Sequence, residues 1–158
     1  GCGVTLKDYA YYLQNDTNYA AKAAKIASLS KDIAELIAAE NYQGLNPEPP
    51  LKRIAWHPPC SLQHGQRIQG VVEQILKNCG YDLLPVVDSH LCCGSAGTYS
   101  ILQPELANQL KINKINHLLM EKPELIVTAN IGCQLHLQEG TSVPVQHWIH
   151  LLDNTKSA

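Results

Sequence analysis

Along the last two thirds of the chain, short apolar runs alternate with amphipathic stretches. The apolar runs, typical of buried strands, occupy residues 52–56, 81–87, 124–129 and 143–146. Between and after them, apolar residues recur at helical spacing and predict helices over residues 66–79, 104–120, 131–138 and 147–152. Strands that alternate with helices are joined by right-handed crossovers. The sequence therefore predicts a three-layer α/β fold, with about four mostly parallel strands and helices on both faces.

The first third of the chain reads as a helical extension of that unit. Residues 4–13 predict a short helix, and Asp16 with Thr17 can cap a longer one that runs to about residue 40. Ser30 leaves open whether this stretch is one helix or two. Its apolar residues keep helical spacing; they are Ile26, Leu29, Ile33, Leu36 and Ile37. Residues 41–50, with three prolines and a glycine, predict a linker.

The composition is that of one globular domain of 158 residues, with 45% hydrophobic and 16% charged residues. The formal net charge is −2 and no basic run is present, so nucleic acid is not an expected partner. No apolar stretch approaches the ~18 residues that span a bilayer, and no signal-peptide pattern opens the chain. Six cysteines and seven histidines indicate a reducing, cytoplasmic compartment and a metal or redox site.

Four cysteines fall where the predicted strands end. Cys60 follows the first strand, Cys92 and Cys93 follow the second, and Cys133 lies just past the third. Loops at the carboxyl ends of parallel strands meet at one sheet edge, so these thiols can converge. Thiolates are soft ligands that select iron–sulfur clusters or zinc. We therefore expect one metal locus formed by Cys60, Cys92, Cys93 and Cys133.

Other candidates are weaker. Cys79 falls on the apolar stripe of its predicted helix, so we expect it to be structural and outside the locus. His57 and His64 flank Cys60, and His90 precedes the cysteine pair; each can bind metal, hydrogen-bond a cluster, or simply satisfy a loop carbonyl. Cys92 and Cys93 can alternatively form a strained vicinal disulfide that acts as a redox switch.

Two short segments of the chain are similar in sequence. GCGVTLKD (1–8) aligns with GCQLHLQE (132–139), and in this alignment Cys2 corresponds to Cys133. A match this short can arise by chance. If it reflects a repeat, residues 1–45 are the tail of a preceding unit with a helical linker, and residues 51–158 are a complete second unit.

These motifs resemble the cysteine-rich CCG domain, and most closely the form found in the iron–sulfur subunits of bacterial glycolate oxidases. The supporting segments are WHPPCSLQHGQ (56–66), LCCGSAGTYS (91–100), TANIGCQ (128–134) and HWI (147–149). The resemblance implies a longer parent with ferredoxin-like motifs upstream and two CCG units. One departure is clear: the fuller pattern ends in Cys-x-x-Cys, and this chain has Asn130 in place of the first of those cysteines.

The resemblance also implies a function. Five cysteines in some relatives hold a non-cubane cluster that acts on sulfur, whereas four favour an ordinary cluster, [4Fe–4S], that passes electrons. A separate flavin-containing subunit would oxidise glycolate, and electrons would pass through this module toward a quinone. The module itself would not be catalytic, and the complex would lie in the cytoplasm, with peripheral association at the inner face of the membrane. On this view Asn130 would donate a hydrogen bond to a cluster sulfur.

Two alternatives remain open from the sequence. The same four thiols suit a structural zinc site, which contributes folding energy without redox chemistry. A thiol–disulfide module that uses Cys92 and Cys93 would instead be active without metal. An iron–sulfur protein that has lost its cluster in air would be metal-free, so metal content after anaerobic purification separates these readings.

Overall fold

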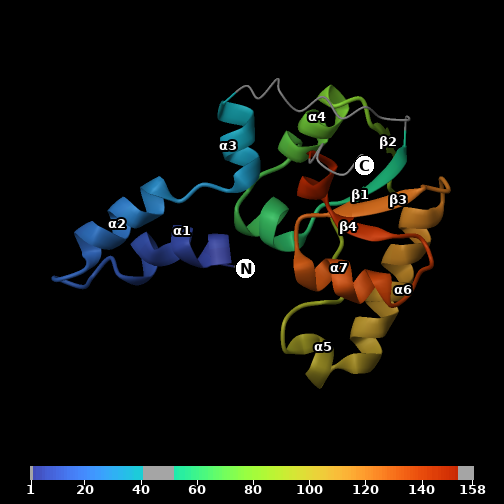
Figure 1. The fold of residues 1–158 in the computed structure, drawn as a ribbon. Helices are drawn as coiled ribbons and strands as arrows, with labels where there is room; N and C mark the ends of the chain where they lie inside the picture. Colours follow the sequence, from blue (N-terminus) through green and yellow to red (C-terminus); the bar gives the residue numbers. More distant parts are fainter. Residues whose placement is uncertain (1, 41–51, 153–158) are drawn as a thin grey trace.

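A four-stranded parallel sheet forms the centre of the molecule (Figure 1). The computed structural model describes residues 2–40 and 52–152. The strands are β1 (Arg53–His57), β2 (Asp82–Leu84), β3 (Leu125–Thr128) and β4 (Val145–His147), in the order β2-β1-β3-β4. Every pairing is parallel, as the alternation of strands and helices predicts. Since β2 and β3 lie on opposite sides of β1, the direction in which strands are added reverses next to β1.

Helices cover both faces of the sheet. They are α4 (Val71–Asn78), α6 (Pro104–Leu119) and α7 (Ile131–Gln138), together with a short α5 (Tyr99–Leu102), a π-helical turn η1 (Ser61–Gly65) and a 3₁₀ turn η2 (Trp148–Leu152). Figure 1 shows α6 and α7 on one side of the sheet and α4 on the other. The three-layer α/β architecture is confirmed.

The sheet separates two apolar cores, because successive side chains of a strand point to opposite faces. Ile54, Trp56 and Val127 join α4 and η2 in the first core. Ala55 and Ile126 join α6 and α7 in the second, which also contains Cys93 and Cys133. The register pairs Ala55 with Ile126 and His57 with Thr128. His57 and Thr128 therefore lie on the same face of the sheet as the two cysteines.

Two predicted helices differ from the structure. The helix expected over residues 66–79 begins only at Val71, because Arg67 and Gly70 have positive φ values of 58° and 75° and end any helix started earlier. Ile68 is buried nonetheless. On α6, the helical spacing of residues 104–120 predicts that Leu106 faces inward, but it is 57% exposed, and Ala107 and Lys114 are buried instead.

The N-terminal extension consists of α1 (Cys2–Tyr12), α2 (Ala20–Leu29) and α3 (Ile33–Ala39). Ser30 separates α2 from α3, so the expected long stretch is two helices. The side chain of Asp16 accepts hydrogen bonds from the backbone N–H groups of Asn18 and Tyr19 just before α2. The linker expected over residues 41–50 lies outside the described residues.

The apolar stripe of this extension is largely uncovered. Of its five residues, Ile37 packs against the first core, while four are 45–64% exposed; these are Ile26, Leu29, Ile33 and Leu36. Helical spacing holds within α2 and within α3, but the break at Ser30 keeps the two runs from forming one continuous face.

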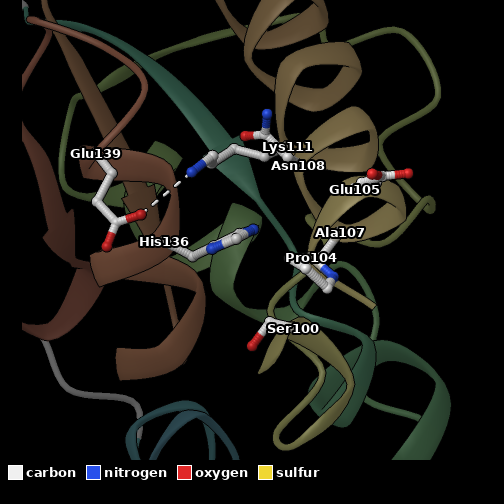
Figure 2. A pocket seen from close by; sticks show the side chains of 8 residues that line it. All are labelled: Ser100, Pro104, Glu105, Ala107, Asn108, Lys111, His136 and Glu139. Atoms are coloured by element: carbon white, nitrogen blue, oxygen red, sulfur yellow. Dashed lines mark hydrogen bonds and ion pairs between the residues drawn. The ribbon is translucent and has the colours of Figure 1, made fainter. Parts of the chain in front are cut away.

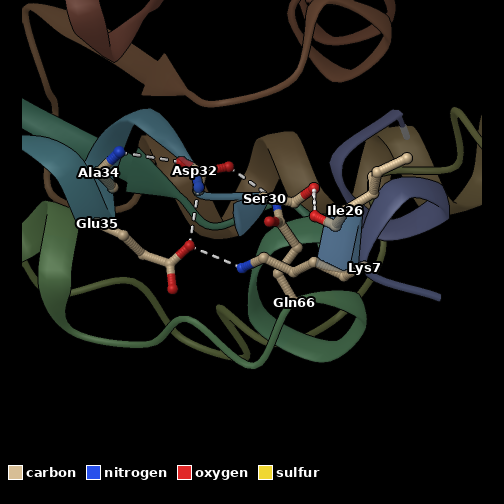
Figure 3. Close-up of polar contacts among 7 residues, drawn as sticks. All are labelled: Lys7, Ile26, Ser30, Asp32, Ala34, Glu35 and Gln66. Carbon is tan, nitrogen blue, oxygen red and sulfur yellow. Dashed lines mark hydrogen bonds and ion pairs between the residues drawn. The ribbon is translucent and has the colours of Figure 1, made fainter. Parts of the chain in front are cut away.

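A polar network fixes α1 and α3 against η1 (Figure 3). Lys7 donates to Glu35 at 2.7 Å, and Gln66 donates to the side chain of Asp32 at 2.7 Å. Asp32 and Glu35 also form a capping box at the start of α3. Burial alone would raise the pKa of Glu35, but its hydrogen bonds from Lys7 and the Asp32 backbone outweigh that effect and lower it.

Across residues 2–40 and 52–152, none of the helices is long and apolar enough to cross a bilayer.

Candidate metal centre

The predicted cysteines surround the point where the strand order reverses. In an open parallel sheet, ligands bind outside the carboxyl ends of the strands at such a point. Cys60 follows the end of β1 by three residues, and Cys133 lies in the first turn of α7, directly after β3. Cys92 and Cys93 lie in the loop that leads from β2 to α5.

The four thiols form one continuous row. Side-chain hydrogen bonds link Cys92 to both Cys60 and Cys93, and Cys93 to Cys133. Cys60 is exposed, Cys92 is half-buried, and Cys93 and Cys133 are buried, so the row leads from the surface into the second core. The structure thus brings these four residues together as a row, of which Cys93 and Cys133 lie within 4.8 Å of each other. That all four hold one metal group stays a prediction.

The surroundings keep two of these thiols protonated while no metal is bound. The hydrogen bond with Cys133, together with burial, raises the pKa of Cys93 to about 12. The hydrogen bond with Cys93, together with burial, raises the pKa of Cys92 as well. A reactive thiol nucleophile needs a lowered pKa, so this environment is the opposite of an activated cysteine.

His57 lies at the inner end of the row. One ring nitrogen of His57 and the sulfur atoms of Cys93 and Cys133 all lie within 4.8 Å of one another. His57 is 1% exposed. Burial, with a smaller effect from Lys114, lowers its pKa to about 3, so the imidazole is neutral and can offer a lone pair.

The loop that carries the cysteine pair is held from two sides. Buried Gln63 donates to the carbonyl of Pro58 at 3.0 Å and to that of His90 at 3.2 Å. Buried Lys114 on α6 donates to the carbonyls of Asp88 and Ser89 at 2.6 and 3.3 Å. The loop therefore has a fixed position relative to β1 and α6.

Gly94 lets this loop lie directly against α6. Its φ is 94°, and a Cβ atom there would overlap the carbonyl oxygen of Ala107. Its backbone N–H donates to the sulfur of Cys92 at 3.3 Å. Such N–H···S contacts are one way in which a protein adjusts the potential of a bound iron–sulfur cluster.

Asn130 has a structural role at the start of α7. Its Oδ1 accepts from the backbone N–H groups of Gly132 and Cys133 at 2.8 and 3.4 Å, so it caps α7. Its Nδ2 donates to Ser61 Oγ at 3.2 Å. The amide oxygen and one amide N–H are thus engaged with protein groups. The expected hydrogen bond to a cluster sulfur would use the second N–H and stays a prediction.

The remaining candidates lie away from the row. Cys79 is the C-cap of α4 and packs against the first core, on the opposite face of the sheet from Cys93. His64 is exposed, and its Nε2 lies 3.3 Å from the carbonyl of His90, whose own side chain faces solvent. Cys2 is exposed in the first turn of α1.

A pocket of about 540 Å³ lies between α5, α6 and α7 (Figure 2). Its eight lining residues are Ser100, Pro104, Glu105, Ala107, Asn108, Lys111, His136 and Glu139. Lys111 and Glu139 form an ion pair at 3.1 Å across one end. None of the four cysteines lines it, so the pocket is a neighbour of the thiol row and separate from it.

Sequence reasoning missed Lys114 and Gln63. Lysine and glutamine are normally surface residues, so their residue type does not mark these two as buried. A polar residue at an inward position of an amphipathic helix is the only available signal, and for Lys114 the neighbouring Ile115 and Leu118 provide it.

The donor set suits a soft metal group. Four sulfur donors and a buried imidazole with no hydrogen-bond partner among the described residues are ligand types for zinc or an iron–sulfur cluster. Carboxylates, which hard cations prefer, do not belong to the group of potential ligands found among the described residues.

Comparison with known proteins agrees with this chemistry. The sequence profile of the cysteine-rich domain family, CCG, matches residues 54–138. The chain is 48% identical over 153 residues to the glycolate oxidase iron-sulfur subunit of Escherichia coli, covering 97% of this chain and 37% of that protein. It is 28% identical to the probable glycolate oxidase iron-sulfur subunit of Bacillus subtilis, covering 97% of this chain and 36% of that protein.

A third relative is the lactate utilization protein A of a Geobacillus strain, at 25% identity over 97% of this chain and 67% of that protein. The chain therefore spans between about one third and two thirds of the length of these relatives. The profile match covers more than half of the chain and includes all four cysteines of the row. The chain belongs to the cysteine-rich CCG domain family.

Proposed function

We propose that this chain is an iron–sulfur electron-transfer module whose cluster is held by Cys60, Cys92, Cys93 and Cys133. The observation that carries the proposal is the continuous row of four thiols at the strand-reversal point of the sheet. Two relatives named as glycolate oxidase iron-sulfur subunits support it. When bound, the cluster, of the [4Fe–4S] type, would accept and release one electron at a time.

The residues of the chain supply the rest of the function. The four thiols give up their protons to become ligands. Gly94 N–H donates to the sulfur of Cys92, and Lys114 lies close enough to Cys93 and Cys92 for its charge to favour their thiolate forms. Cys60, at the exposed end, is the edge of the site from which electrons can pass to or from a partner.

The partner we propose is a flavin-containing glycolate oxidase subunit on the cytoplasmic side of the membrane, with a quinone as final acceptor. The support is the name of the 48% identical relative. Purification of the tagged protein from its native host should bring a flavoprotein with it, seen by flavin fluorescence. Recovery of the protein with no flavoprotein would contradict this assignment.

We also propose that residues 1–45 come from a preceding unit of the same family, and that residues 51–158 form a complete one. The support is the sequence similarity between residues 1–8 and residues 132–139. In addition, Cys2 lies in the first turn of α1 as Cys133 does in that of α7.

Anaerobic reconstitution tests the central proposal. Metal-free protein is incubated with ferrous iron and sulfide, and separately with Zn²⁺. Bound iron and acid-labile sulfide are then assayed, with absorption and EPR spectra before and after reduction. We expect a brown protein with iron and sulfide and an EPR signal that changes on reduction. Binding of Zn²⁺ with no iron or sulfide would support the structural zinc alternative.

The thiol–disulfide alternative predicts a different result. It requires Cys92 or Cys93 to be a ready nucleophile, whereas the pKa of both is raised in the metal-free protein. We therefore expect slow alkylation of this pair at neutral pH. Rapid alkylation and metal-independent disulfide reductase activity would favour the alternative.

A further inference from the structure

His57 is a buried imidazole that lacks a protein partner. It is the last residue of β1 and is 1% exposed. Among the described residues, neither Nδ1 nor Nε2 has a hydrogen-bond partner. Leaving such groups unpaired in an apolar interior is destabilising. The fold therefore holds His57 in a position that burial alone does not explain.

The surroundings of His57 show what could satisfy it. The register places it on the face of the sheet that α6 and α7 cover. The sulfur atoms of Cys93 and Cys133 and a ring nitrogen of His57 all lie within 4.8 Å of one another. Thiols are weak hydrogen-bond partners, so they do not satisfy an imidazole well. A metal accepts all three donors at once.

We propose that His57 is a nitrogen ligand of the metal group, bound beside Cys93 and Cys133 at the buried end of the thiol row. The inference rests on the proposed function in that it concerns the same metal group. It goes beyond that function by assigning a donor of a different chemical type, an imidazole nitrogen, to the metal group. Imidazole ligands in place of thiolates raise the reduction potential of an iron–sulfur centre.

Two other histidines provide controls. His64 also lies near Cys60 in the sequence, but its side chain is exposed and directed to the carbonyl of His90. His90 is exposed too. If closeness to the cysteines in the sequence were enough, His57, His64 and His90 would all have the same role. Direct ligation of the metal instead requires His57.

The test is pulsed EPR of the reduced, iron-loaded protein, prepared with natural-abundance and with ¹⁵N-labelled histidine. We expect the strong nitrogen hyperfine coupling of a directly bonded imidazole, changed by the labelling. The coupling should be lost in His57→Leu and kept in His64→Gln. Because labelling requires no substitution, the wild-type result stands even if the His57 variant does not fold.

A second measurement uses Co²⁺ alone as the probe. Titration of metal-free protein should give thiolate-to-metal absorption bands, and His57→Leu should weaken Co²⁺ binding roughly tenfold or more. His57→Cys should restore part of the affinity, since it returns a donor. Metal-free His57→Leu should be at least as stable to heat as the wild type, because it removes an unpaired polar group.

The outcomes separate the two proposals. Iron and sulfide in the wild type without a histidine coupling, and with unchanged binding in His57→Leu, would overturn ligation by His57 and leave the electron-transfer module standing. A histidine coupling to Co²⁺ in a protein that takes up no iron or sulfide would support His57 and overturn the electron-transfer module.

Discussion

Asn130 at the end of β3 donates a hydrogen bond to Ser61 at the end of the β1 loop, with 3.2 Å between Nδ2 and Oγ. The two residues are 69 positions apart in the chain. Ser61 follows Cys60, and Asn130 caps the helix that carries Cys133. This one contact therefore joins the loops that bear the first and the last cysteine of the row.

Substitution of Asn130 should separate its two roles. Asn130→Ala removes both the cap and the link to Ser61, and we expect it to lower the free energy of unfolding by about 1 kcal/mol or somewhat more. Asn130→Asp keeps an acceptor for the N–H groups of Gly132 and Cys133 and loses only the donor to Ser61. It should retain most of the stability while binding metal more weakly than the wild type. Denaturant unfolding and metal titration measure both; equal stability losses in the two variants would contradict this division.

Gly94 and Gly97 form a matched pair for testing the cysteine loop. Both have positive φ values, but a Cβ atom at Gly94 would collide with the backbone of α6, whereas at Gly97 it would meet nothing within 4 Å. We expect Gly97→Ala to cost about 1 kcal/mol. Gly94→Ala should be more destabilising and should also displace Cys92 and Cys93, so that metal uptake falls. Metal uptake that is equal in the two variants would show that the close approach at Gly94 does not position the cysteines.

The sheet and the convergence of the cysteines follow from features that the sequence displays directly. The predicted helix over residues 131–138 has the bounds of α7, since Asn130 caps it and the apolar run of β3 ends just before it. Parallel pairing follows from the crossovers, and parallel pairing brings the strand-end cysteines together. The strands, the helix α7 and the approach of the four strand-end cysteines could therefore be predicted from the sequence.

Other features depend on tertiary contacts that no local pattern reveals. The start of α4 at Val71 depends on the positive φ of Arg67, a conformation that sequence does not announce for arginine. Lys114 is buried because loop carbonyls from 25 and 26 residues earlier accept its hydrogen bonds. From the sequence alone, His57 could not be distinguished from His64 and His90 as a candidate ligand. The register of the sheet places it on the same face as Cys93 and Cys133.

Lys114 should influence the reduction potential of a bound cluster. A buried ammonium near Cys93 and Cys92 stabilises the extra negative charge of the reduced state, so Lys114→Met should lower the potential. Lys111→Met on the same helix is the control, because Lys111 pairs with Glu139 outside the thiol row. Redox titration followed by EPR gives both potentials. If Lys111→Met lowered the reduction potential as much as Lys114→Met does, the effect would not be specific to Lys114.

Acid should destabilise the metal-free protein through His57. Its pKa is about 3 in the folded state against an ordinary value of 6.5, so the unfolded chain takes up the proton first as the pH falls. The contribution of neutral His57 is fully present above pH 6.5 and is lost progressively toward pH 3. His57→Leu should flatten this part of the profile, and His64→Gln should not. Denaturant midpoints at several pH values measure it, and a wild-type slope unchanged in His57→Leu would contradict the assignment.

Cys60, Cys92, Cys93 and Cys133 together should hold one metal group, to which Cys79 does not belong. The direct measurement is iron and acid-labile sulfide per protein after anaerobic reconstitution of the five single Cys→Ser variants. Each substitution in the row should remove most of the bound iron, because it removes a ligand. Cys79→Ser should keep wild-type iron content, with a stability loss on the order of 1–3 kcal/mol at most. Wild-type iron in Cys92→Ser, together with loss of iron in Cys79→Ser, would show that this assignment of the ligands is wrong.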